Sequence, residues 1–366
     1  MTRGREYLLV AMIGVIAPCR AAAQTGTTAR TGVFFESYSL GSGLGFRRIS
    51  EFTIPISVTQ RFGDRLAIDV GTAFTRASAD VGGTTIDHAG LVDTDLRATI
   101  SVVPGRVVFN IVGTIPTGAT AVSDTTVPLF GATATDLLGF TTPNFGSGGG
   151  VSAGFASAFK MGTDWAIGAG ASYRYGASYT PLRDGKTLTP GGEIRARFGI
   201  EGPFGGGKYF RGALVYTTTG DNGIEGGTQS TIGDRILAYG ATSLPVGRSH
   251  LSLYGWEMRR MRARASTLPV PRGNVLALGA RLERPLNPKA TLVPLFEFRH
   301  ELTGPGAKME LLGYLFRTGS DLRYRLSDRA TGVLQAQLAF GALQSPDHKR
   351  VSILGPRIGA LIEWTR

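Results

Sequence analysis

The stretch from Trp165 to Tyr175 reads WAIGAGASYRY, and its side chains alternate between two kinds. One face is apolar, starting with Trp165 and ending with Tyr173 and Tyr175, whereas the other carries small side chains and Arg174. Strict alternation predicts an extended strand. Aromatic side chains at both ends of the apolar face are typical of a strand that crosses a bilayer, because Trp and Tyr favour the two membrane interfaces. A core strand of a soluble β-protein with the same flanking residues is the alternative.

The same two-residue period recurs along most of the chain from residue 30 onward. Its clearest examples are residues 51–61, 93–102, 193–201 and 276–283, where apolar side chains alternate with charged, polar or small ones. One face of each strand therefore suits an apolar environment and the other suits water. The pattern predicts an all-β protein, and alternation alone leaves both a soluble sandwich and a membrane barrel open.

The spacing of the turns narrows this choice. Short connections are predicted at residues 61–64, 104–106, 161–164, 202–208, 245–248, 285–289 and 327–329. Longer connections fall between them, at residues 39–48, 77–88, 116–148, 176–190, 218–232, 263–272, 302–308 and 343–349. Strict alternation of short and long connections is typical of an up-and-down barrel with both termini at one end. We therefore predict a transmembrane antiparallel barrel of about 16 strands, within a range of roughly 14 to 18.

The beginning of the chain has the features of a secretory signal peptide. Two arginines precede an apolar run at residues 7–17, and the small residues Ala21–Ala23 suit a cleavage site. We predict a signal peptide at residues 1–24 and a single barrel domain at residues 25–366. A short buried helix and a lipid anchor on Cys19, the only cysteine, are the alternatives for this segment. No apolar run reaches the roughly 18 residues that a transmembrane helix needs.

In layout, the chain resembles bacterial outer-membrane porins and related barrel transporters. The resemblance covers residues 25–366. It rests on the leader, the alternating connections, the very long connection 116–148, and a last strand whose apolar residues alternate up to Trp364. It implies an outer-membrane location, short periplasmic turns, long outer loops, and a loop, here residues 116–148 by position, that narrows the lumen. It also implies the outer-membrane assembly machinery as a partner and a homotrimer as one oligomeric state.

Two features depart from the porin pattern. Barrels of this kind usually end on an aromatic residue, whereas Thr365 and Arg366 follow Trp364 here. The constriction loop of porins is typically acidic, whereas this loop has only two acidic residues and no Lys or Arg. The residues that we expect to form the constriction are Asp124, Leu129, Phe130, Asp136, Leu137, Leu138 and Phe140. Because most of these side chains are apolar, passage of apolar compounds is one expectation.

Charged side chains on the polar faces of the strands would line the lumen of such a barrel. The predicted set is Arg97, Arg195, Arg197, Arg281, Arg299, Arg317, Arg323, Glu193, Asp93 and Asp95. An excess of arginine would favour the entry of anions, as rings of charge do in other pores. The alternative is that these charges pair across neighbouring strands and only fill the wall.

The net charge of +12 is spread over many strands, with one local cluster. Arg259, Arg260, Arg262 and Arg264 fall at the outer end of a predicted strand. Guanidinium groups bind phosphate bidentately, so we expect contacts with outer-membrane lipid, such as the phosphates of lipopolysaccharide. The solvated base of a loop is the alternative. Nucleic acid is not an expected partner, because no binding motif accompanies the charges.

No group of residues has the pattern of a catalytic or cofactor site. The sequence GPFGGGK at residues 202–208 has the spacing of a phosphate-binding loop. However, Tyr209 stands where that motif requires Ser or Thr, and a strand follows instead of a helix. The four histidines lack the spacing of metal ligands. We therefore predict no enzyme activity, no cofactor and no metal site.

The preferred hypothesis is an outer-membrane channel for passive diffusion of small solutes, with a lumen narrowed by residues 116–148. Anions would be favoured by the arginines, or apolar compounds by the loop. A non-conducting barrel with a structural or surface-binding role is the first alternative. A soluble secreted β-protein and a barrel enzyme follow it.

Overall fold

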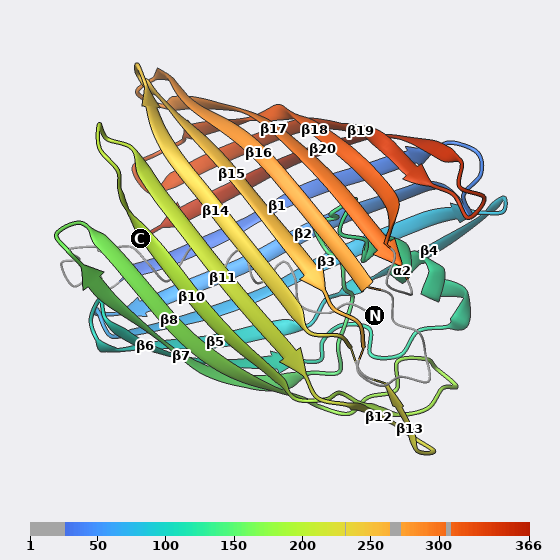
Figure 1. Cartoon of the computed structure of the whole chain (residues 1–366). Coiled ribbons are helices and arrows are strands. Elements are labelled where there is room, and N and C mark those ends of the chain that lie inside the picture. Colours follow the sequence, from blue (N-terminus) through green and yellow to red (C-terminus); the bar gives the residue numbers. More distant parts are fainter. Residues whose placement is uncertain (1–25, 231, 264–271, 305–308) are drawn as a thin grey trace.

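The computed structural model describes residues 26–230, 232–263, 272–304 and 309–366, and the predicted signal segment 1–24 lies outside them. The described chain forms a closed antiparallel barrel of 16 strands (Figure 1). The predicted fold class and strand number are confirmed. Among the described residues, no helix is long and apolar enough to span a membrane.

The strands of the barrel follow one another in chain order. They are β1 Gly26–Leu40, β2 Phe46–Phe62, β3 Leu66–Val81, β4 Thr84–Leu91, β5 Thr94–Val103, β6 Val107–Ile115, β7 Gly150–Met161, β8 Trp165–Gly176, β10 Glu193–Pro203, β11 Tyr209–Thr219, β14 Arg235–Val246, β15 Ser249–Arg260, β16 Arg272–Asn287, β17 Ala290–Gly304, β18 Glu310–Arg325, β19 Ala330–Gln344 and β20 Arg350–Thr365. β4 and β5 together make one strand of the barrel, because both pair with β3.

The remaining elements lie in the long connections. The short strands β9 Leu188–Thr189, β12 Asn222–Ile224 and β13 Thr228–Ser230 form a separate sheet. The connection between β6 and β7 holds the 3-10 turn η1 Asp124–Thr126 and the helix α2 Val127–Thr133. The seven predicted short connections lie at the end of the barrel where both described termini lie, whereas at the other end the predicted long connection between β3 and β4 is a two-residue turn.

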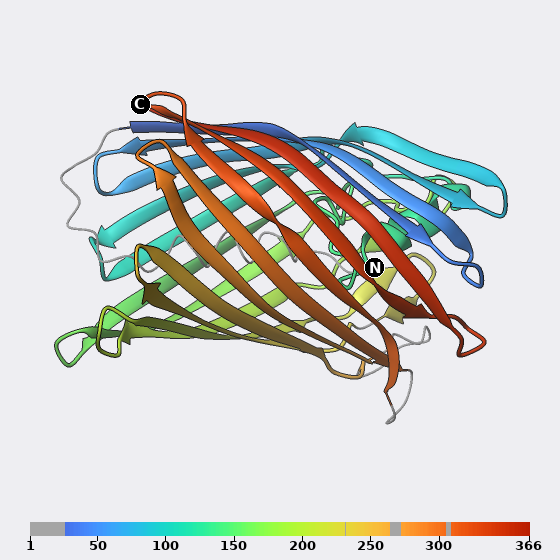
Figure 2. The ribbon, with the colours of Figure 1, turned by 90° about the horizontal axis from the view of Figure 1, so that it is seen from above.

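The barrel closes between its first and last strands, which lie side by side (Figure 2). Ala29 of β1 is opposite Trp364 of β20, and Phe35 is opposite Ile358. β1 also pairs with β2 along its whole length. Closure matters because an open sheet would leave a row of unpaired N–H and C=O groups at each edge.

The two faces of the wall differ in the way that the alternation predicts. Large apolar side chains point outward, and several of them are half exposed, including Leu334 at 59% and Ile362 at 52%. Polar and charged side chains point inward, and some are almost fully buried there, such as Glu51 at 1%. Successive residues of a strand point to opposite faces, so one sequence pattern produces both surfaces.

The predicted loop at residues 77–88 is wrong in its extent, because β3 and β4 continue through it as a hairpin. Pairing runs up to Val81 opposite Thr84, and only Gly82 and Gly83 form the turn. Both glycines have positive φ, 58° and 88°, which a two-residue hairpin turn of this hand requires. The strand is interrupted further on, between β4 and β5, where Val92 and Asp93 are buried.

Candidate functional site inside the barrel

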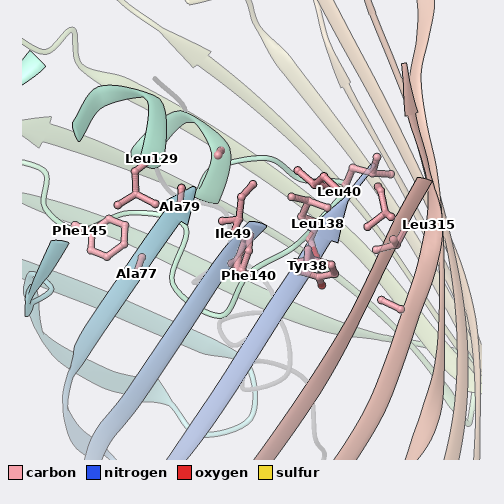
Figure 3. Packing of buried hydrophobic residues seen from close by; sticks show 14 residues of the cluster. Tyr38, Leu40, Ile49, Ala77, Ala79, Leu129, Leu138, Phe140, Phe145 and Leu315 are labelled. Carbon is pink, nitrogen blue, oxygen red and sulfur yellow. Dashed lines mark hydrogen bonds between the residues drawn. The ribbon is translucent and has the colours of Figure 1, made fainter. Parts of the chain in front are cut away.

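The connection from β6 to β7, residues 116–149, packs against the inner surface of the wall near the long-loop end (Figure 3). Its apolar side chains join those of the wall in a single cluster. The loop contributes Leu129, Ala132, Leu137, Leu138, Phe140 and Phe145, and the wall contributes Tyr38, Leu40, Ile49, Ala77, Ala79, Leu315, Ala339 and Ile353. A buried Leu or Phe side chain contributes about 1.5 to 3 kcal/mol, so this cluster offsets much of the entropy lost when the loop is ordered.

Aromatic contacts fix the two halves of the loop. Phe140 packs edge-on against Tyr38 of β1, with the ring centroids 5.1 Å apart. Phe130 stacks on Phe145 at 4.7 Å, and His88 of β4 packs edge-on against both rings. The β3–β4 hairpin therefore contacts the loop at one side and β1 contacts it at the other.

The burial of these side chains corrects one interpretation of the sequence. Leu129, Leu137, Leu138 and Phe140 were expected to face a passing solute, but each is at most 2% exposed. Their position between loop and wall is the physical reason, because they gain most from leaving water there. They attach the loop and do not offer an apolar path.

Carboxylates of β1 and β2 bind the loop backbone beside the apolar cluster. Glu51 accepts a hydrogen bond from the backbone N–H of Thr142 at 2.8 Å. Glu36 accepts one from the backbone N–H of Thr141 at 3.0 Å and another from the Thr141 hydroxyl. Loop amides that would otherwise lose water on burial are satisfied in this way.

A third carboxylate holds the two ends of the loop together. Asp93, a predicted lumen residue, lies in the interruption between β4 and β5 and is 7% exposed. Its carboxylate accepts a hydrogen bond from the Ser147 hydroxyl at 2.6 Å and from the Gly118 N–H at 3.2 Å. The break in the strand thus turns an acidic side chain toward the base of the loop.

Residues of β17 and β18 hold the far side of the loop. Arg317 donates to the carbonyl of Leu138 at 3.0 Å, and Arg299 donates to the carbonyl of Asp136 at 2.8 Å. The carboxylate of Glu301 accepts the N–H of Leu137 at 3.1 Å. Because β17 and β18 are distant in sequence from β6 and β7, these contacts tie the loop to another part of the wall.

Gly139 allows the closest approach of loop and wall on this side. Its φ is +59°, a conformation that residues with a Cβ rarely adopt. A Cβ at this position would also collide with the guanidinium group of Arg299. The glycine therefore serves both the local turn and the contact with β17.

The hydroxyl of Thr142 gives a specific test of the attachment. It is 3.1 Å from the Thr75 hydroxyl, which donates to it, and 3.3 Å from the Thr53 hydroxyl. We expect Thr142→Val to destabilise the loop by about 1 to 3 kcal/mol, because the shape is kept while a buried donor loses its acceptor. Cleavage of the loop by chymotrypsin in the folded protein would become faster.

Thr135→Val is the matched control, since among the described residues the Thr135 hydroxyl bonds only within its own turn, to the carbonyl of Gly131 at 3.4 Å. It should leave the cleavage rate unchanged. Equal rates for wild type and Thr142→Val would contradict the attachment.

Half of the ten predicted lumen charges form ion pairs on the inner face in the described residues. The ion pairs are Arg195–Glu193 at 2.6 Å, Arg299–Glu297 at 2.8 Å, Arg317–Glu297 at 3.5 Å and Arg323–Glu283 at 3.2 Å. Asp95 accepts a hydrogen bond from Thr114 at 2.7 Å. By contrast, Arg97, Arg197 and Arg281 have no carboxylate within ion-pair distance in the described parts of the chain. Cross-strand pairing therefore accounts for part of the predicted set. Arg97, Arg197 and Arg281 remain as arginines without an ion pair in the described residues.

The cluster at the end of β15 is divided between the two faces of the wall. Arg259 pairs with Glu257 at 3.4 Å on the outer face. Arg260 points inward, because neighbouring residues of a strand face opposite sides, and it interacts with Glu301. Arg264 lies outside the described residues. Binding of lipid phosphate by the four arginines stays a prediction.

The two acidic residues of the loop lie apart. Asp124 is exposed in η1, and Asp136 is partly buried beside Arg299, which binds its carbonyl. The most important attachments, Glu36 and Glu51 with their partners Thr141 and Thr142, were missing from the predicted site. Alternation at residues 51–61 placed Glu51 on the polar face, but nothing in the sequence indicated that the loop would cover Glu51 or Glu36.

Comparisons with known proteins found distant similarity to solved structures of outer membrane proteins. No family model matches the chain, and no curated protein matches it. Among solved structures, OmpT of Vibrio cholerae, an outer membrane protein, is 12% identical with a TM-score of 0.41, covering 95% of this chain and 100% of that one. The outer membrane channel DcaP of Acinetobacter baumannii is 12% identical with a TM-score of 0.43, covering 93% and 98%. An outer membrane channel of Pseudomonas putida F1 is 13% identical with a TM-score of 0.39, covering 95% and 99%. Similarities of this size carry no argument about function.

Proposed function

We propose that this protein is an outer-membrane channel for passive diffusion of small solutes, with a lumen narrowed by the loop 116–149. The observation that carries the proposal is the closed barrel of 16 strands with an apolar outer surface and a charged inner surface. A barrel of this strand number is wide enough to leave an aqueous passage.

The outer surface supports insertion in a membrane. Large apolar side chains such as Phe155, Phe198, Leu278 and Leu334 are exposed around the barrel. A water-soluble protein would rarely expose so extensive an apolar surface. Outer-membrane location is part of the proposal, because closed barrels of this kind are the form in which strands cross a bilayer.

The outward face gives a prediction about stability. Phe155 lies in the middle of β7 and is 50% exposed. We expect Phe155→Arg to lower the free energy of unfolding in lipid by about 2 to 4 kcal/mol, because an arginine near the bilayer centre loses its hydration. Urea unfolding of the protein refolded in lipid vesicles measures the change.

Ser152→Arg, on the inner face of the same strand, is the control. It should cost much less, because an inward-facing side chain does not meet lipid. A smaller loss for Phe155→Arg than for Ser152→Arg would contradict the membrane assignment.

The loop supports a constriction of the passage. Charged residues of β1 and β2 on one side and of β17 and β18 on the other bind backbone groups of the loop, and Thr75 of β3 binds its Thr142 hydroxyl. A segment fixed at several points is suited to filter solutes by size.

The inner surface supports selection of anions over apolar compounds. Arg97, Arg197 and Arg281 form no ion pair in the described residues, whereas the apolar side chains of the loop are buried. Positive charge in the wall lowers the barrier for anions. Admission of apolar compounds is therefore not part of the proposal.

Single-channel recording in a planar bilayer under a salt gradient tests this function. The refolded protein should give discrete conductance steps, and the reversal potential should have the sign of anion preference. A reversal potential of cation preference would overturn the selectivity.

A non-conducting barrel is the second candidate, favoured by the number of bonds that fix the loop. If vesicles contain folded, heat-modifiable protein and no steps occur, this candidate replaces the channel.

A further inference from the structure

A polar pocket of about 90 Å³ lies in the inner wall on the side opposite the β6–β8 strands. Six neighbouring strands, β15 to β20, contribute to it. Its lining consists of Tyr254, Arg281, Leu295, Glu297, Arg317, Gln335, Gln337 and Arg357. None of these residues comes from the loop, so the pocket belongs to the wall.

Three of the side chains that line the pocket each have a buried polar atom without a hydrogen-bond partner. These are Nε of Arg317, Nε of Arg357 and Oε1 of Gln335. Arg317 is only 5% exposed. An unpaired buried donor on a charged group costs several kcal/mol when nothing compensates it, so these atoms point to a ligand or ordered water.

The atoms without partners define the chemistry of the ligand. Two guanidinium N–H groups require an acceptor, and the free oxygen of Gln335 requires a donor. The orientation of the Gln335 amide is set by its NH₂ group, which donates to Asp321 at 3.0 Å. The complementary ligand therefore has an oxyanion and a hydroxyl group.

The charges around the pocket set the charge of the ligand. The lining holds three arginines and one glutamate. Arg299, Glu36 and Asp321 contact this lining, and including them leaves four arginines against three carboxylates. The excess is one positive charge, which matches a singly charged anion.

Arg281 is the arginine with the most freedom to bind. It lies over the ring of Tyr254, with Cζ at 5.7 Å from the ring centroid, and has no ion pair in the described residues. The ring of Tyr254 lies over Gly279, where a Cβ would collide with it. The glycine thus leaves room for the tyrosine to hold Arg281 beside the pocket.

We infer that this pocket binds a small, singly charged hydroxycarboxylate, with Arg281, Arg317 and Arg357 at the carboxylate and Gln335 at the hydroxyl. The inference deepens the proposed function. That the bound solute is also a transported one rests on the proposed channel. Arginine suits this ligand because its planar fork matches a carboxylate.

The site is coupled to the loop by two of its arginines. Arg317 donates to the carbonyl of Leu138, and Arg357 donates to the hydroxyl of Thr141 at 3.0 Å. Each uses Nη2 for the loop, and its Nε has no hydrogen-bond partner in the described residues. The same side chains therefore position the loop and face the bound anion.

Isothermal titration calorimetry of the refolded protein in detergent, with glycolate, acetate and phosphate as probes, tests the inference without requiring conduction. We expect saturable binding of glycolate, weaker binding of acetate, and still weaker binding of phosphate. Arg281→Met should weaken glycolate binding about ten-fold or more, because a charge-assisted contact is lost. Arg281 has no contact with the loop, so this variant keeps the loop attachments.

Arg323→Met is the matched control, since Arg323 lies on the same inner face and pairs with the exposed Glu283, outside the pocket. It should bind glycolate like the wild type. Absence of saturable glycolate binding, acetate or phosphate binding as tight as glycolate, or an equal loss in both variants would overturn the site. Because binding is measured at equilibrium, a barrel that binds glycolate but gives no conductance would contradict only the channel.

Discussion

Replacing Val122–Phe140 by a short glycine–serine linker should raise the single-channel conductance about two-fold or more, because the barrel itself is wide and the loop fills part of it. The replaced segment contains α2 and five of the six apolar residues that pack the loop against the wall. The strands keep all their pairing partners, because residues 122–140 contain no strand of the barrel. Planar-bilayer recording of both proteins in the same salt measures the ratio.

A second deletion separates this effect from a general loss of outer structure. Residues 222–230, which carry β12 and β13, belong to a small sheet beyond the wall (Figure 1). Their removal should leave the conductance unchanged. If both deletions changed the conductance equally, or if the loop deletion left it unchanged, the loop would not be the constriction.

Substitution of Arg317 by Met should lower the free energy of unfolding by about 3 to 5 kcal/mol, as expected when one partner of a buried ion pair is removed. Arg317 is 5% exposed and joins Glu297 of the wall to Leu138 of the loop. Glu297 keeps Arg299 at 2.8 Å, so we expect the loss to lie toward the lower end of this range. Urea unfolding in lipid vesicles measures it.

The loop should also become more mobile in this variant, seen as larger current fluctuations in the open channel. Arg323→Met removes the ion pair to Glu283, whose side chains are 44% and 45% exposed. Exposed pairs contribute about 0 to 1 kcal/mol, so this control should be nearly neutral. Similar losses in the two variants would mean that Arg317 does not bridge loop and wall.

The fold could be predicted because alternation and turns, the two signals that define it, are both local in the sequence. Alternation at residues 51–61 places Phe52 outside and Glu51 inside, and a turn at residues 61–64 returns the chain beside itself. Repetition of these two signals sets strand number and closure. The hairpin of β3 and β4 was missed, because polar side chains and glycines there resemble a loop while pairing continues.

The interior could be predicted only in part. Alternation identified the inward charges but not their pairs. Some side chains form ion pairs across an intervening strand, as Glu193 of β10 does with Arg235 of β14 at 2.8 Å. The apolar loop residues were recognised, yet their burial depends on Tyr38 and Leu315, which lie far away in sequence. Contacts of this kind follow from the closed barrel and not from any local pattern.

Entry of solutes into proteoliposomes tests the central proposal most directly. Vesicles that contain the refolded protein should swell in small sugars at a rate that falls steeply with sugar size, and vesicles with the 122–140 replacement should admit larger sugars. Impermeability of both kinds of vesicle, with the barrel folded, would contradict the account and leave a closed barrel.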